Sequence, residues 1–97
     1  MVDPLTDAIR WSERNSEAFH QIMHWAQEDI AAGARPSIGL YAELLRRPHF
    51  ANKLRLERSD TAFLINNNLR ADLARLLNRD WWFNFRTRKA RADDWQS

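Results

Sequence analysis

The stretch FLINNNLRADLARLL, residues 63–77, decides the fold, because it joins a short apolar run to an amphipathic helix through three asparagines. Four leucines recur at helical spacing and form one apolar face: Leu69, Leu73, Leu76 and Leu77. The other side of the same helix is polar and carries Arg70, Asp72, Arg75 and Arg79. The spacing predicts a helix over 67–79 with one buried and one exposed face.

The asparagines Asn66, Asn67 and Asn68 exceed what the start of one helix requires. A single asparagine at the N-cap accepts a hydrogen bond from a free backbone N–H of the first turn, which stabilises a helix by about 1 kcal/mol relative to alanine. The surplus has two explanations. Either the side chains tie the preceding loop to itself, or their amides are exposed at the positive end of the helix dipole, where they suit phosphate or an adenine edge.

Upstream of this stretch, the pattern indicates further helices. Apolar residues alternate at spacings of four and three from Leu5 and predict a long acidic helix over 4–33, or a helix pair with a break near SERNSE, residues 12–17. Gly33 suits the end of that helix and Pro36 prevents its continuation. Ser37 is a candidate N-cap for a helix over 37–47.

Residues 48–65 have no single interpretation. KLRLER, residues 53–58, alternates leucine with charge, so a short β-hairpin near 53–65 with Ser59 and Asp60 in its turn is one prediction. A short helix beginning at Pro48 is the other. The predicted fold class is therefore mainly α: a single small helical domain over 1–97 with three to four helices. The type is helix-turn-helix-like, or winged-helix-like if the hairpin forms.

Composition excludes several classes of protein. The chain has 97 residues and no cysteine, so neither disulfides nor thiolate zinc ligation are available. The N-terminus has no leader pattern and no apolar run is long enough to span a membrane, which indicates a cytoplasmic protein without a membrane partner. Residues 1–33 contain six acidic and two basic residues, whereas the remainder contains 13 basic and seven acidic ones. The second part of the chain is therefore basic.

The C-terminal segment, residues 80–97, contains WWFNFRTRKAR at 81–91, where four aromatics precede a run of basic residues. One interpretation is that Trp81, Phe83 or Phe85 pack on the preceding helix. The other is that aromatics interleaved with arginine hold single-stranded nucleic acid by stacking and phosphate neutralisation. Five tryptophans are too many for one small core, so one or two are expected at the surface.

Catalytic and metal-binding patterns are weak. His20 and His24 stand four residues apart, with Glu17 and Glu28 one turn to either side, but the glutamate of H-E-x-x-H and a marked third ligand are missing. We expect a solvated polar face there. The sequence predicts no enzyme, no catalytic residue, no metal site and no cofactor.

A set of short motifs recurs in a recognisable order. Asn15 leads a helix with Phe19 four residues on, a helix ending in arginine follows at 37–47, and an extended run closes on Asn66 and Asn67. A helix containing Ala-Arg-x-Leu at 74–77 comes next, and Phe85 stands three residues before Arg88. This order resembles that of small phage- and prophage-type helical proteins of unknown function over about residues 15–88. The chain departs from their pattern at Leu69 and at 81–82, and the resemblance implies a phage or mobile-element setting without supplying an activity.

Two functional hypotheses follow. The first is a small regulatory DNA-binding protein that presents the Asn66–Arg79 helix to DNA and uses the basic C-terminal tail. Its contact residues would be Asn67, Asn68, Arg70, Arg75, Arg79, Arg86, Arg88, Lys89 and Arg91. The alternative is a phage-encoded protein-interaction module that binds and modulates a host protein. Its contact residues would be Trp81, Trp82, Phe85 and Trp95, and its acidic N-terminal helix would offer a second face or a homodimer seam.

Overall fold

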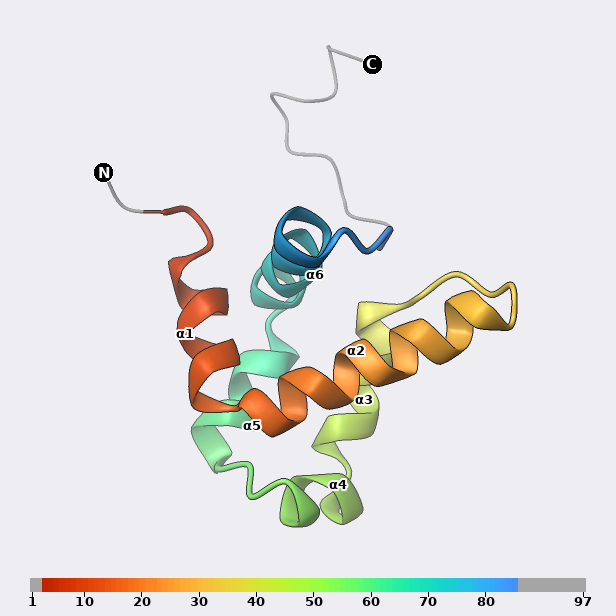
Figure 1. Ribbon diagram of the computed structural model, residues 1–97. Helices are drawn as coiled ribbons and strands as arrows, with labels where there is room; N and C mark the ends of the chain where they lie inside the picture. The colour runs from red at the N-terminus through yellow and green to blue at the C-terminus, as the bar shows by residue number, and fades with distance from the viewer. Residues whose placement is uncertain (1–2, 86–97) are drawn as a thin grey trace.

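The computed structural model describes residues 3–85, which form six α-helices and no strand (Figure 1). The helices are α1 Thr6–Arg14, α2 Ser16–Ala31, α3 Ile38–Arg46, α4 Pro48–Lys53, α5 Arg58–Ile65 and α6 Asn67–Trp81. The predicted mainly helical class is confirmed, as are the helices expected at 37–47 and 67–79. The predicted number of three to four helices was too low.

The N-terminal stretch is the helix pair rather than one long helix, and the break is at Asn15. The Asn15 backbone N–H still donates to the Trp11 carbonyl at 2.8 Å, which closes α1. Its side-chain amide donates to the Trp11 carbonyl at 3.3 Å and to the Asp60 carboxylate at 3.1 Å. The Asn15 side chain thus bonds both the end of α1 and a residue of α5 at the point where the two helices separate.

The predicted hairpin near 53–65 is wrong, because residues 58–65 are helix α5. Glu57 and Asp60 form a capping box at its start, in which each side chain accepts a hydrogen bond from the other residue's backbone N–H. Leu54 and Leu56 lie in the connection between α4 and α5, and both pack against the core. Their alternation with charged residues therefore reflects an irregular connection and not a strand. A winged helix needs a strand pair, which residues 3–85 do not contain.

The core lies where α6 meets the other helices. Leu73, Leu76 and Leu77 are fully buried, which confirms the apolar face of this helix, although Leu69 is only partly buried. Helix α6 packs against α1, α3 and α5, while α2 crosses the front of the molecule in contact with α1 and α3 (Figure 1). The short helix α4 packs on α3 and lies at the lower end of the molecule in Figure 1.

Polar contacts connect α2 and the segment after α6 to this core. The Tyr41 hydroxyl of α3 donates to the Asp29 carboxylate of α2. Burial raises the pKa of Tyr41, and the hydrogen bond to Asp29 raises that pKa further. After α6 the chain turns back, and the Asn78 side chain bonds both the N–H and the carbonyl of Phe85, at 2.8 and 3.0 Å. The Phe85 ring packs against Tyr41, with ring centroids 6.1 Å apart.

No helix within residues 3–85 has the length and apolarity to cross a membrane.

Candidate functional site

The asparagines before α6 have largely structural roles. The Asn66 side chain is the N-cap and accepts hydrogen bonds from the backbone N–H groups of Asn68 and Leu69, at 2.9 and 3.4 Å. The Asn67 side chain accepts a hydrogen bond from Arg70 in the next turn of the same helix. Asn68 is exposed and lines a shallow pocket of about 170 Å³ together with Asn67, Ala71 and Arg75. The capping explanation therefore accounts for Asn66, and an exposed amide remains at Asn68.

The three arginines of α6 do not share one face. Arg70 and Arg79 are nine residues apart, which is about two and a half helical turns and places them on opposite sides. Arg70 faces α3, where its Nη1 lies 3.9 Å from the Glu43 carboxylate. Arg79 faces the start of α1, where its Nη1 lies 3.1 Å from the Asp3 carboxylate. The continuous arginine surface expected from the sequence is therefore divided.

Each of these arginines also has a carboxylate partner. Arg75 bonds Asp72 at 2.8 Å, and Arg79 bonds Asp80 at 2.9 Å in addition to Asp3. The hydrogen bonds that Arg79 donates to Asp80 are the largest cause of the raised pKa of Arg79. The pKa of Asp3 is lowered, first by the Leu5 backbone N–H and then by Arg79. Helix α6 itself holds three basic and two acidic side chains, but Asp3 and Glu43 from outside the helix also engage its arginines, so none of the three is left without a carboxylate partner.

The positive charge of the described protein is concentrated elsewhere, between residues 34 and 58. This segment contains six basic and only two acidic residues. Both acids are engaged, since Glu43 pairs with Arg46 at 2.8 Å and Glu57 pairs with Arg14 at 3.0 Å. Five cations of this segment form no ion pair with any residue between 3 and 85: Arg35, which precedes α3, and four that lie close to α4 in the sequence. We call these four the α4 cations; they are Arg47, Lys53, Arg55 and Arg58. Dividing the chain only after Gly33 hid this concentration, which a shorter sequence window would have found.

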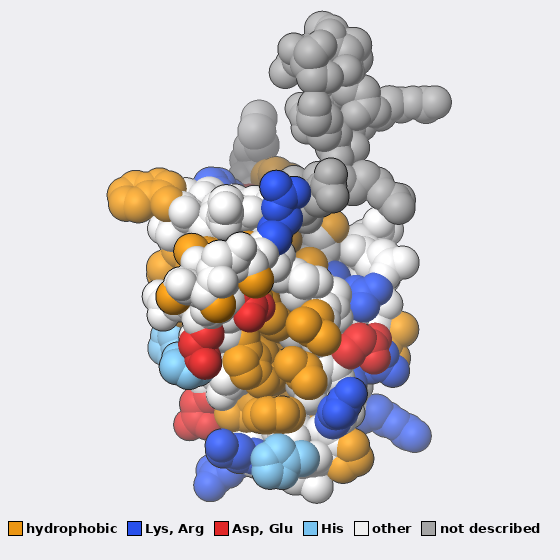
Figure 2. Space-filling model, turned by 90° about the vertical axis from the view of Figure 1, so that its right-hand side faces the viewer, with side chains coloured by type: hydrophobic (Ala, Val, Ile, Leu, Met, Phe, Trp, Pro, Cys, Tyr) orange, Lys and Arg blue, Asp and Glu red, His pale blue; other side chains and the backbone are white. Residues whose placement is uncertain are grey.

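The α4 cations border one end of the molecule. Arg47 is the N-cap of α4, Lys53 is its last residue, Arg55 follows its C-cap, and Arg58 is the first residue of α5. Helix α4 is the lowest helix in Figure 1. Figure 2 shows basic and histidine side chains along the lower edge of one face, at the height of α4, below a region where hydrophobic side chains gather. Acidic side chains stand higher, at the sides of that hydrophobic region (Figure 2).

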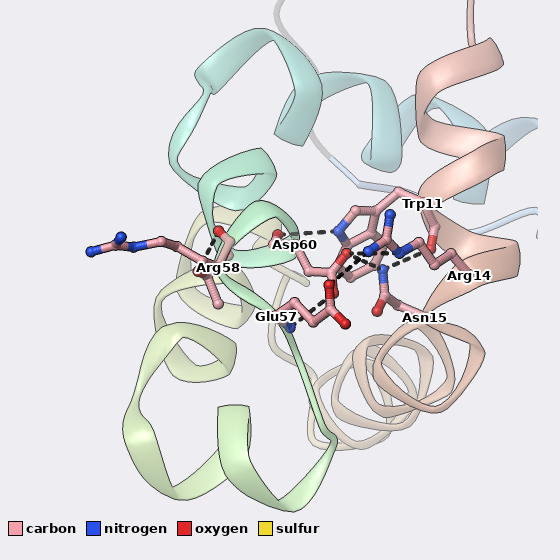
Figure 3. A network of polar contacts seen from close by, with 7 residues as sticks. Trp11, Arg14, Asn15, Glu57, Arg58 and Asp60 are labelled. Atoms are coloured by element: carbon pink, nitrogen blue, oxygen red, sulfur yellow. Dashed lines mark hydrogen bonds and ion pairs between the residues drawn. The ribbon is translucent and has the colours of Figure 1, made fainter.

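A polar network explains why the acids near α4 do not neutralise these cations (Figure 3). Asp60 is nearly buried, and its carboxylate accepts from the Glu57 N–H at 2.9 Å and lies 3.4 Å from the Arg14 Nε. The Trp11 indole N–H donates to the Asp60 carbonyl at 3.2 Å. Glu57 therefore turns toward Arg14 on α1, whereas the Arg58 side chain extends away from the network (Figure 3).

Arg55 occupies a backbone position that usually belongs to glycine. Its φ is +56°, and the N–H groups of Arg55 and Leu56 donate back to the carbonyls of Asn52 and Ala51, at 3.3 and 2.8 Å. This is the Schellman arrangement that ends many helices, in which a left-handed residue follows the cap. An arginine there is strained by about 1 kcal/mol relative to a residue without a Cβ.

The contact residues predicted for a protein partner are only partly exposed. Phe85 was wrongly assigned to that surface, because it is 5% exposed and packs in the core against Tyr41. Trp81 is 46% exposed and lies edge-to-face on Phe19. Trp82 is 89% exposed and left-handed, with a φ of +57°. Trp95, like the predicted cationic contacts Arg86, Arg88, Lys89 and Arg91, lies outside the described residues.

The histidine pair of α2 is a surface feature. The His24 Nε2 lies 2.7 Å from the Glu28 carboxylate, and both side chains are more than half exposed. Residues 3–85 contain no group of three or more histidine, cysteine, aspartate or glutamate side chains placed to hold a metal ion.

Comparison with known proteins supplies no relative. No family model, no curated protein and no solved structure matches the chain. The resemblance to phage-type proteins therefore stays a prediction.

Proposed function

We propose that the protein binds nucleic acid, and that the α4 cations are its main contact with phosphate. One observation carries this proposal. Residues 3–85 contain eleven basic and eleven acidic side chains, and six of the basic ones have no carboxylate partner; four of these six fall within the twelve residues 47–58, which include α4. In a neutral body, a local surplus of this kind favours a polyanionic ligand.

The arginines of α6 are less suited to the same role. A phosphate that approached Arg70 or Arg79 would compete with Glu43, Asp3 or Asp80 for the guanidinium group. The α4 cations carry no such competition, and three of the four are arginines, whose planar fork matches phosphate oxygens. The basic residues of the C-terminal tail, which lie outside the described range, would add further phosphate contacts.

The proposal predicts a strong dependence of affinity on salt. On duplex DNA each neutralised phosphate contributes about −0.9 to the slope of log K against log salt. Four contacts contribute about −3.6 to that slope, so the α4 cations alone would weaken binding about 150-fold between 50 and 200 mM salt.

The test is an anisotropy titration of labelled mixed-sequence DNA with the full chain. A quadruple variant (Arg47→Gln, Lys53→Gln, Arg55→Gln, Arg58→Gln) should bind more weakly and with a slope that is smaller by about 3.6. The matched control replaces Arg75 and Arg79 with glutamine on α6 and should leave the slope unchanged. A slope that falls in the control and not in the quadruple variant would move the contact to α6. No binding at 50 mM salt would overturn the proposal.

A protein partner is the second candidate, and Trp82 favours it. A tryptophan that is 89% exposed and held in a left-handed conformation presents a large apolar side chain to solvent. If the phage resemblance reflects origin, the partner would be a protein of the host cell. A pull-down from bacterial lysate tests this, because Trp82→Ala should lose a captured host protein that the parent chain retains, whereas equal capture by both would exclude Trp82.

A further inference from the structure

Three aromatic side chains form a contacting group at α4, the helix that the α4 cations flank in the sequence. Trp25 of α2 contacts Phe50 of α4 edge-to-face, with ring centroids 5.1 Å apart. His49, which directly precedes Phe50 in the chain, also lies edge-to-face with it, with ring centroids 5.0 Å apart. His49 is exposed, and Trp25 and Phe50 are half-buried. In this group Trp25 and Phe50 pack against each other, and the ring of His49 is accessible to solvent.

The sequence of α4 places these rings among the cations. Pro48 is the first residue of the helix, so His49 and Phe50 belong to its first turn. Lys53 stands four residues after His49 and therefore shares its side of the helix. Arg47 directly precedes the helix as its N-cap. An accessible ring thus lies between two cations within a span of seven residues.

This combination fits a single strand better than a duplex. In a duplex the faces of the bases are stacked on one another, and sequence is read by an element that enters the major groove. Helix α4 has six residues and is about 9 Å long, which is short for a recognition helix. A single strand exposes both its phosphates and the faces of its bases, and proteins hold it with cations and aromatic rings together.

We infer that α4 is a binding site for single-stranded nucleic acid, in which a base stacks on the His49 ring, Phe50 supports that ring, and Arg47 and Lys53 hold the flanking phosphates. This inference rests on the proposed nucleic-acid binding and adds the class of ligand. DNA and RNA share the chemistry that α4 recognises, namely a flexible phosphate chain with unstacked bases.

The experiment compares His49→Ala with His24→Ala in the full chain. His24 is an equally polar, exposed histidine on α2, and its substitution controls for loss of an imidazole. Labelled 12-mers are titrated at 50 mM salt as single-stranded DNA, single-stranded RNA, duplex DNA of the same sequence, and a DNA single strand with abasic sites at its centre. Circular dichroism checks that each variant is folded.

The expected result is that His49→Ala weakens binding of a single strand by about fivefold or more, since stacking of one base contributes that much or more. His49→Phe should restore binding, while His24→Ala and the duplex titration should show no effect of comparable size. On the abasic strand the parent chain and His49→Ala should bind equally. The DNA and RNA strands report which sugar is preferred, and a His49 effect on either one supports the inference.

Two failures have different meanings. If the parent chain binds none of the four ligands, the proposed function fails and this inference fails with it. If the parent chain binds duplex as tightly as single strand, and His49→Ala binds both as the parent does, nucleic-acid binding stands and stacking on α4 is excluded.

Discussion

Replacing Asp60 with alanine tests the network that positions the start of α5. The Asp60 side chain is 5% exposed, and its carboxylate accepts from the Glu57 N–H at 2.9 Å and from the Asn15 amide at 3.1 Å. It also lies 3.4 Å from the Arg14 Nε. Alanine removes all three contacts, while the hydrogen bond from Trp11 to the backbone carbonyl of residue 60 can remain.

The magnitude follows from which partners reach water after the substitution. A hydrogen bond to a charged group stabilises a protein by about 1.5–3 kcal/mol when its partner is otherwise stranded in the interior. The Glu57 N–H and the Asn15 amide make part-buried bonds to Asp60, and the Asn15 amide keeps its bond to the Trp11 carbonyl, so each loss is taken near the lower end of this range. Arg14 is more than half exposed, so its ion pair contributes little. We expect Asp60→Ala to lower the free energy of unfolding by about 3–4 kcal/mol, out of about 5–15 kcal/mol for a domain of this kind.

Urea unfolding followed by far-ultraviolet circular dichroism measures this loss. The control is Asp72→Ala, which removes an aspartate that pairs with Arg75 three residues away on one helix, with both side chains partly exposed. That substitution should cost less than about 0.5 kcal/mol. Asp60→Asn should fall between the two, because the amide oxygen can accept only part of what the carboxylate accepts. If Asp60→Ala and Asp72→Ala lower stability equally, the network does not hold α5 in the way the distances indicate.

The remaining predictions concern Arg55 and Asp3. Arg55→Gly should raise the free energy of unfolding, measured in urea, by about 0.5–1 kcal/mol, because glycine relieves the left-handed strain. The same variant should bind nucleic acid more weakly, because a cation is lost. Arg55→Ala should lose affinity without the gain in stability. For Asp3, the folded-state pKa is lowered, so its contribution to stability is present above the ordinary aspartate pKa and is lost as pH falls through the folded-state value. A carboxyl NMR titration should show that Arg79→Gln raises this pKa only in part, since the Leu5 N–H still donates; a full return to the ordinary value would refute the leading role of Leu5.

The helices that local sequence signals define were predictable. The leucine spacing and the asparagine cap located α6, which begins at Asn67 after the Asn66 N-cap. Ser37 likewise located α3, where its hydroxyl accepts from the Leu40 N–H at 3.3 Å. In both cases the capping side chain and the residues it bonds lie within one turn. Short-range bonds of this kind are legible in a sequence because no other part of the chain takes part in them.

The elements that depend on distant partners were not predictable. The start of α5 has a local capping box of Glu57 and Asp60, but Asp60 is also held by Arg14 and Asn15, which are about 45 residues away in the sequence. Without them, the alternation of leucine and charge at 53–58 favours a strand. The arginines of α6 were misleading for the same reason, since the carboxylates of Asp3 and Glu43 that engage Arg79 and Arg70 are 76 and 27 positions away. A charge pattern in a sequence shows which residues are basic and does not show which are already paired.

The distribution of paired and unpaired charge is the strongest reason to look for a ligand at α4. The two carboxylates nearest to this helix in the sequence pair with other residues: Glu57 pairs with Arg14, and Glu43 pairs with Arg46 and Arg70. The fold also keeps an arginine at the left-handed position after α4, where glycine would be less strained. The strained backbone at Arg55 costs stability, and exposed cations without partners add none, so these features are explained more readily by a bound polyanion than by folding alone. The same argument predicts that removing the α4 cations would stabilise the protein or leave it unchanged while weakening its binding, which is the behaviour expected of functional residues and not of structural ones.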